Sequence, residues 1–192
     1  MRVMILPEDF VKDEQVLLPI IKRLMAEVGR PRAKVLVCKD PRFHGTSHAL
    51  KWEWIEQALD RHRGMVDLFL LCVDRDGEIG RRTQLDRIEA LAAEKVGPDR
   101  IFLAENAWQE LEVWILAGHD LPREWDWNTI RAERDPKEYY FQPFAERRGV
   151  LDQPGQGRGK LAIEAAARYD RIRSLCKEDV LNLESRIKQR LG

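Results

Sequence analysis

The chain has 192 residues, which is the size of one ordinary domain. Hydrophobic residues make up 44% of it, which is enough for a packed core and excludes a disordered chain. Its 33 lysine and arginine residues balance 33 acidic residues, which excludes a polybasic nucleic-acid coat but allows a local basic patch.

The cysteines and the lengths of the apolar runs indicate in which cellular compartment the protein is expected. Three separated cysteines, with no Cys-x-x-Cys pair, argue against a zinc site and against a disulfide framework. No apolar run approaches the roughly 18 residues that cross a bilayer, and the first residues are too short a run for a signal peptide. We therefore expect a cytoplasmic protein that has no contact with a membrane.

Short apolar runs alternate with amphipathic stretches along the first 118 residues. Ser47 directly precedes the helix expected over 48–62 and is expected to cap its N-terminus. Alternation of this kind predicts a Rossmann-like α/β fold, with a four-stranded, mainly parallel sheet flanked by helices. The expected order is strand 3–6, helix 13–28, strand 33–38, helix 48–62, strand 66–73, helix 82–95, strand 101–104 and helix 106–117.

The remaining residues divide into two segments. Residues 119–158 lose the periodicity and are rich in proline and aromatic residues, so we expect an irregular cap on the α/β core of residues 1–118. Residues 159–192 return to a helical pattern and are expected to form C-terminal helices that pack on the core.

Acidic residues follow three of the predicted strands, at the edge where open parallel sheets bind ligands. They are Glu8 and Asp9 after the first strand, Asp74, Asp76 and Glu78 after the third, and Glu105 and Glu112 after the fourth, where the amide of Asn106 follows Glu105. Converging carboxylates repel one another unless a cation lies between them. Mg²⁺ prefers oxygen ligands, so the pattern predicts a magnesium site.

The spacing of Asp74 and Asp76 strengthens this prediction. Residues i and i+2 of a strand point to the same side, so both carboxylates can reach one cation or two adjacent cations. The alternative is a plain turn, because Asp and Gly are favoured turn residues and Gly77 follows the pair.

These residues resemble the TOPRIM fold, the metal-binding domain of topoisomerases, primases and OLD-type nucleases. Glu8 and the pair Asp74 and Asp76 match its glutamate and Asp-x-Asp. The chain is most similar to a family of short prokaryotic TOPRIM-like proteins, through Glu112–Ala117 and a lysine, Lys160, at the start of the C-terminal helices. One departure is Asp9, where many TOPRIM proteins have glycine.

The resemblance implies Mg²⁺ or Mn²⁺ and phosphoryl transfer, often by a nuclease in antiviral defence that acts beside an ATPase partner. It implies that Asp74, Asp76 and Glu112 bind metal. Glu8 would be a further ligand or the general base, and Lys160 or a nearby arginine would contact the phosphate.

The C-terminal segment carries nine basic and five acidic residues from Gly155 onward. Arg158, Arg168 and Arg171 could share a helical face and follow a phosphate backbone. The alternative is a solvated helix face with intrahelical ion pairs.

The leading hypothesis is a Mg²⁺-dependent nuclease, or a related phosphoryl-transfer enzyme, that acts on DNA or RNA. One rival is a non-catalytic binding module that partners an ATPase, and another is a small-molecule phosphohydrolase. The sequence leaves open whether the protein forms a homo-oligomer.

Overall fold

The sheet has four strands, all of them parallel. A computed structural model describes all residues from 1 to 192 and places the strands in the order β2-β1-β3-β4. The strands are β1 (Arg2–Pro7), β2 (Lys34–Val37), β3 (Leu68–Asp74) and β4 (Ile101–Ala107). The expected α/β class with a four-stranded parallel sheet is confirmed.

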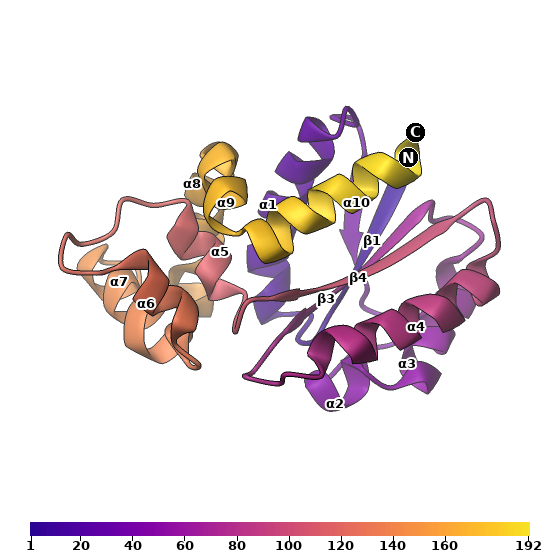
Figure 1. The fold of residues 1–192 in the computed structure, drawn as a ribbon, viewed down its shortest axis with the longest axis horizontal. Helices are drawn as coiled ribbons and strands as arrows, with labels where there is room; N and C mark the ends of the chain where they lie inside the picture. The colour runs from indigo at the N-terminus through magenta and orange to yellow at the C-terminus, as the bar shows by residue number, and fades with distance from the viewer.

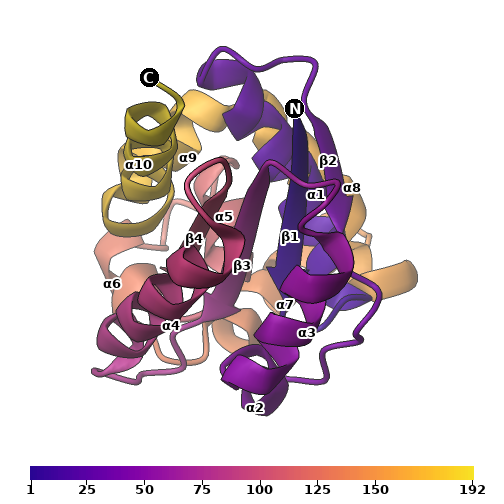
Figure 2. The same ribbon diagram turned by 90° about the vertical axis from the view of Figure 1, so that its right-hand side faces the viewer.

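Helices cover both faces of this sheet (Figures 1 and 2). One face carries α1 (Lys12–Glu27) together with α8 (Arg158–Ala167), α9 (Tyr169–Leu175) and α10 (Asn182–Leu191). The other face carries α2 (Thr46–Ala49), α3 (Trp52–His62) and α4 (Arg81–Val96). The first helix of the chain and the last three therefore lie in the same layer, on one face of the sheet.

The central strand β3 supplies apolar side chains to two separate cores. Leu68 and Leu70 pack on the α1 side, whereas Phe69 and Leu71 pack on the α3 and α4 side. Successive strand residues point to opposite faces, so a strand covered on both faces must be apolar throughout. This explains why the run from residue 66 to residue 73 shows no polar alternation.

Two predicted helices differ from the observed ones. β4 pairs with β3 as far as Asp74 and Ala107, so the helix expected over 106–117 is only α5 (Glu112–Ala117). The helix expected over 48–62 is divided into α2 and α3. Gly45, with a φ of 78°, precedes α2, and Ser47 caps neither helix.

Residues 119–158 contain more regular structure than expected, and they form a lobe at one end of the molecule (Figure 1). Their apolar side chains Ile130, Phe141 and Phe144 join the same core as α1 and α8, so the segment is packed. It consists of α6 (Trp127–Ala132), the π-helical turn η1 (Lys137–Phe141), α7 (Gln142–Arg147) and the 3-10 turn η2 (Pro154–Gly157).

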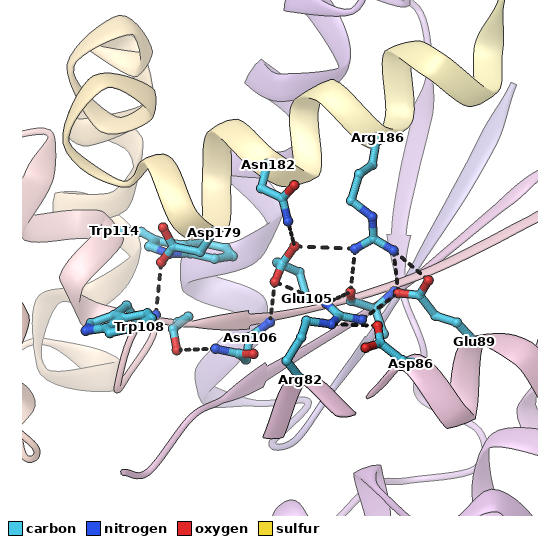
Figure 3. A network of polar contacts seen from close by, with 12 residues as sticks. Arg82, Asp86, Glu89, Glu105, Asn106, Trp108, Trp114, Asp179, Asn182 and Arg186 are labelled. Carbon is cyan, nitrogen blue, oxygen red and sulfur yellow. Dashed lines mark hydrogen bonds and ion pairs between the residues drawn. The ribbon is translucent and has the colours of Figure 1, made fainter. Parts of the chain in front are cut away.

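The C-terminal helices are joined to the sheet by polar networks (Figure 3). Asp179, in the π-helical turn η3 (Lys177–Leu181), is almost fully buried. Its carboxylate accepts hydrogen bonds from the backbone of Trp108 at 2.9 Å, from the indole of Trp114 at 2.8 Å and from Arg131 at 3.1 Å. A buried carboxylate with this many donors holds η3 and α10 against β4 and α5.

The position of Glu105 corrects the expectation that it contributes to the acidic edge. Glu105 lies inside β4, and its oxygens accept bonds from Arg82, Arg186 and Asn182 at 3.0 to 3.4 Å (Figure 3). The strand extends past the predicted end because it follows its pairing with β3. Glu105 is therefore part of the scaffold that attaches α10.

Candidate functional site

A small polar cleft, the acidic pocket, lies at the carboxyl edge of the sheet. Its volume is about 180 Å³, and no hydrophobic side chain lines it. Six of its ten lining residues are acids, and the full lining is Glu8, Asp9, Lys12, Asp13, Gly45, Asp74, Glu110, Glu112, Lys137 and Arg158. One of these acids, Asp9, lies in the loop between β1 and α1.

The topology brings four of these carboxylates together. Glu8 directly follows β1 and Asp74 ends β3, and these strands are neighbours in the sheet. Asp13 lies in the first turn of α1, and Glu112 is the first residue of α5. The carboxyl ends of parallel strands and the helices that leave them meet at one edge, as expected for an open parallel sheet.

Glu8 is held in place through both of its carboxylate oxygens. Oε1 accepts a hydrogen bond from the backbone N–H of Asp74 at 3.0 Å, and Oε2 accepts one from the hydroxyl of Thr46 at 2.6 Å. Burial raises the pKa of Glu8, and the two hydrogen bonds partly oppose that rise. Glu8 therefore links β1, β3 and α2 at this edge.

Asp74 is the most strongly perturbed acid of the pocket. Its Oδ1 accepts a hydrogen bond from the backbone N–H of Leu111 at 2.8 Å. Burial raises its pKa well above the usual range, and the charges of Glu112, Glu8 and Asp13 raise it further. Burial together with the proximity of like charges distinguishes this carboxylate from one at an ordinary, solvated end of a strand.

Asp13 and Glu110 carry pKa values near neutrality. Burial raises the pKa of each to about 7, although Asp13 accepts a backbone hydrogen bond from Asp9 at 2.8 Å and Glu110 accepts one from Lys137 at 2.7 Å. Neighbouring carboxylates, Glu8 for Asp13 and Glu112 for both, add to the rise. Desolvated acids of this kind gather at functional sites more often than on ordinary surfaces.

Glu112 is paired with Arg158 inside the pocket. One oxygen of Glu112 accepts bonds from Nε of Arg158 at 2.8 Å and from Nη2 at 2.5 Å, and both residues are buried. The guanidinium also donates to the carbonyl of Gly155 and the side chain of Gln156. Arg158 therefore acts as a fixed cation of the acidic pocket, which corrects the expectation that it lies on an exposed nucleic-acid-binding face.

Asp76 does not line the acidic pocket. β3 ends at Asp74, and Asp76 has a left-handed backbone with a φ of 54°. Its carboxylate lies 3.5 Å from the guanidinium of Arg81. The i and i+2 rule holds only within a strand, so the turn separates two acids that the spacing placed together.

Gln109 shapes this turn, and the sequence did not single it out. Its backbone carbonyl accepts hydrogen bonds from the backbone N–H groups of Arg75 at 2.7 Å and Asp76 at 3.2 Å. Its side-chain oxygen accepts a hydrogen bond from the backbone N–H of Gly77 at 2.9 Å. Gln109 itself has a φ of 76°. The loop after β4 therefore determines where the chain after β3 runs.

The other predicted basic residues lie away from the acidic pocket. Lys160 is in the first turn of α8 but does not line the pocket. Arg168 lies between α8 and α9, and Arg171 lies in α9. Both bind the carboxylate of Asp120, Arg168 at 2.9 and 3.0 Å and Arg171 at 3.4 Å. Arg158 lies ten residues before Arg168, about 15 Å along a helix, so the three arginines do not form one binding face.

The pocket contains residues to which sequence reasoning gave no role. Asp13 could have been found, because an acid in the first turn of a helix that leaves a strand end points to the same edge. Glu110 and Lys137 carried no such signal. Lys137 comes from the aromatic segment, which the sequence did not place over the site.

The carboxylates suit a hard divalent cation by their chemistry, but they are not assembled around one. No group of three or more His, Cys, Asp or Glu side chains has an arrangement that could hold a metal ion. Asp13, Asp74 and Glu112 each keep one oxygen without a hydrogen bond. Mg²⁺ commonly takes only one or two protein carboxylates and fills its other positions with water, so two of these oxygens suffice.

No protein-family model, no curated protein and no solved structure matches this chain. None of its helices combines the length and the apolar character needed to cross a bilayer. All three cysteines are buried and free.

Proposed function

We propose that the acidic pocket binds Mg²⁺ or Mn²⁺ and that the protein is a metal-dependent phosphoryl-transfer enzyme that hydrolyses phosphodiesters of nucleic acid. The observation that carries this proposal is the convergence of Glu8, Asp13, Asp74 and Glu112 on one hydrophilic pocket at the carboxyl edge of the sheet. Burial raises the pKa of Asp74 most, and repulsion by Glu112, Glu8 and Asp13 adds to the rise. A divalent cation would relieve that repulsion.

Asp74 and Glu112 are the proposed ligands. Each has a free oxygen, and Glu112 is the carboxylate that raises the pKa of Asp74 most. Glu8 is a positioning residue in this proposal, because both of its oxygens are engaged by Asp74 and Thr46. When bound, the cation would neutralise charge on the phosphate and lower the pKa of a bound water.

The chain supplies groups for the remaining steps. Asp13 has a free oxygen and a pKa of about 7, which suits a general base at neutral pH. Lys12, Lys137 and Arg158 line the same pocket and are the cations available to a phosphate oxygen. Lys160 has no place in this arrangement.

The test is the cleavage of single- and double-stranded DNA and RNA and of a panel of phosphorylated metabolites, with Mg²⁺, with Mn²⁺ and with EDTA. The proposal expects metal-dependent cleavage of at least one nucleic acid by the wild type. The Asp74→Asn variant should lose at least 100-fold in rate, in line with the loss of a major electrostatic contribution. The control is Asp99→Asn, which removes an exposed acid at the opposite edge of the sheet.

Cleavage in EDTA, or full activity of Asp74→Asn, would overturn the proposal. Hydrolysis of metabolites alone would retain the phosphoryl-transfer chemistry and reject nucleic acid as the substrate. Mg²⁺ binding can be followed separately, because a ligand that binds only the folded state raises its thermal midpoint. That rise should disappear in Asp74→Asn and persist in Asp99→Asn.

A second candidate is a non-catalytic module that docks a partner such as an ATPase. The observation that favours it is the pairing of acids with arginines, Glu112 with Arg158 and Asp76 with Arg81. In this case no metal-dependent cleavage is expected from the purified chain. A nucleotide-dependent complex with a purified ATPase, weakened by charge reversal at Asp76, would support the module.

A further inference from the structure

A second hollow, the arginine pocket, lies between α2 and the start of α4. Its volume is about 390 Å³, more than twice that of the acidic pocket. It contains two cations and one acid, and its lining is Thr46, Ser47, Leu50, Lys51, Glu78, Arg81 and Gln84. None of these residues lines the acidic pocket.

Arg81 is a buried cation whose donors are poorly satisfied. It is only 6% exposed, and its Nε has no hydrogen-bond partner. Its other contacts are all long, 3.4 Å to Gln84, 3.4 Å to the carbonyl of Arg75 and 3.5 Å to Asp76. A buried charge is costly unless it is paired and fully hydrogen-bonded. Arg81 has only the distant pair with Asp76, and its Nε lacks an acceptor that an anion would supply.

The start of α4 adds free backbone donors beside this guanidinium. α4 has 16 residues, no side chain caps it, and no acid lies in its first turn. The backbone N–H groups of Arg82 and Thr83 have no acceptor. Unsatisfied N–H groups and the positive end of the helix dipole both favour an anion at this position.

The opposite wall supplies a free ammonium and a free hydroxyl. Lys51 and Ser47 are exposed, and neither forms a side-chain ion pair or hydrogen bond. Glu78 is the one acid of the lining, and it is exposed to solvent. The donors on this wall and on α4 match the acceptor oxygens of a phosphate group.

The two pockets are neighbours. The hydroxyl of Thr46, which lines the arginine pocket, donates to Glu8 of the acidic pocket at 2.6 Å. Gly45, the residue before Thr46, lines the acidic pocket. A nucleic-acid strand with one phosphate in the acidic pocket would therefore pass over Thr46 toward Arg81.

We propose that the arginine pocket binds a second phosphate of the nucleic-acid strand whose neighbouring phosphodiester lies in the acidic pocket. The assignment to a strand rests on the proposed function, whereas phosphate binding at Arg81 does not. A free inorganic phosphate has the same chemistry and is the other source of the group. Binding in EDTA separates the two proposals, because it requires neither the metal nor cleavage.

The experiment measures binding to the full chain in EDTA by calorimetry, with three probes. They are inorganic phosphate, a short oligodeoxythymidylate, and the same oligomer with uncharged methylphosphonate linkages. The wild type should bind the charged oligomer at least tenfold more tightly than the other two probes. Arg81→Met should lose at least tenfold in affinity and Lys51→Ala several-fold, whereas Arg87→Ala, on an exposed face of α4, should stay within twofold.

Lys51→Ala keeps the test valid if Arg81→Met does not fold, because Lys51 is exposed. Equal affinity of Lys51→Ala, Arg81→Met and the wild type for the charged oligomer would overturn the proposal. Equal binding of the charged and uncharged oligomers would overturn it as well, because it excludes a phosphate contact. Arg81-dependent binding of inorganic phosphate alone would overturn the assignment to a strand. If binding follows the expected pattern but Mg²⁺ supports no cleavage, the proposed catalytic function fails while the phosphate site stands.

Discussion

Arg158 donates two hydrogen bonds to a single oxygen of Glu112, at 2.8 and 2.5 Å, and leaves the other oxygen of that carboxylate free. Both side chains are less than 10% exposed. The pair joins the start of α8 to the start of α5 at the wall of the acidic pocket. The carboxylate of Glu112 therefore forms a structural ion pair with one oxygen and leaves the other as a candidate metal ligand.

Replacement of Arg158 by alanine should destabilise the chain by about 3–5 kcal/mol, because it leaves the buried carboxylate of Glu112 without a partner. Urea denaturation at neutral pH measures the change. Glu112→Gln in the Arg158→Ala background should recover part of the loss, because the buried charge is gone. The exposed pair of Arg147 and Glu124 is the control, and its loss should change stability far less. An equally small effect of Arg158→Ala would show that the pair is solvated.

Stability should fall as the pH rises from about 4 to about 7. Asp13 and Glu110 have a pKa of about 7 in the folded chain, and unfolded carboxyls titrate near pH 4. Between these values the folded state binds more protons than the unfolded state, so the free energy of unfolding decreases with pH.

Asp13→Asn tests this dependence, because it removes one titrating group. Its denaturation free energies at pH 5, 6 and 7 should decline less steeply than those of the wild type, and Asp99→Asn should leave the slope unchanged. Parallel slopes for Asp13→Asn and the wild type would mean that Asp13 titrates normally.

Arg186→Ala should loosen α10 from the edge of the sheet. The guanidinium of Arg186 binds both oxygens of Glu89, at 2.6 and 2.5 Å, and donates to the carbonyl of Ala104 at 2.9 Å (Figure 3). It thereby covers a backbone group of the edge strand β4. Hydrogen exchange should become faster in α10 and at the edge of β4.

Exchange in α3, on the opposite face of the sheet, is the internal control for Arg186→Ala and should stay unchanged. Uniform acceleration over the whole chain would indicate global destabilisation instead. Lys188→Ala, which removes an exposed lysine that pairs with the buried Glu184 within α10, is the matched variant. It should leave exchange at β4 unaffected.

Gly118→Ala should cost about 1–3 kcal/mol through overpacking. A Cβ at Gly118 would lie 2.5 Å from the backbone Cα of Ala165, so α5 and α8 would have to separate. Gly64→Ala is the control, since a Cβ there meets nothing within 4 Å, and it should be nearly neutral. Equal thermal midpoints for the two variants would show that the contact between α5 and α8 can adjust.

Most of the sheet could be predicted from the sequence. The run at residues 3–6, and the run at 66–73 apart from Asp67, are apolar on both faces, a pattern typical of a covered parallel strand. It also indicated the edge at which Glu8, Asp74 and Glu112 meet, because the position of a residue after a strand places it at a known edge. It misplaced Glu105, because local pattern does not show that pairing with β3 prolongs β4 to Ala107.

Elements far apart in the sequence decided the rest. Asp76 turns away from Asp74 because Gln109, more than thirty residues later, binds the backbone of the turn. Arg158 lies in the acidic pocket because α8 packs beside α1 and α5. The sequence by itself determined the parallel sheet and the acidic edge, because both follow from residue periodicity and strand order. Only the tertiary structure decided which carboxylates share the pocket and which cations face them, because these depend on side-chain contacts between distant segments.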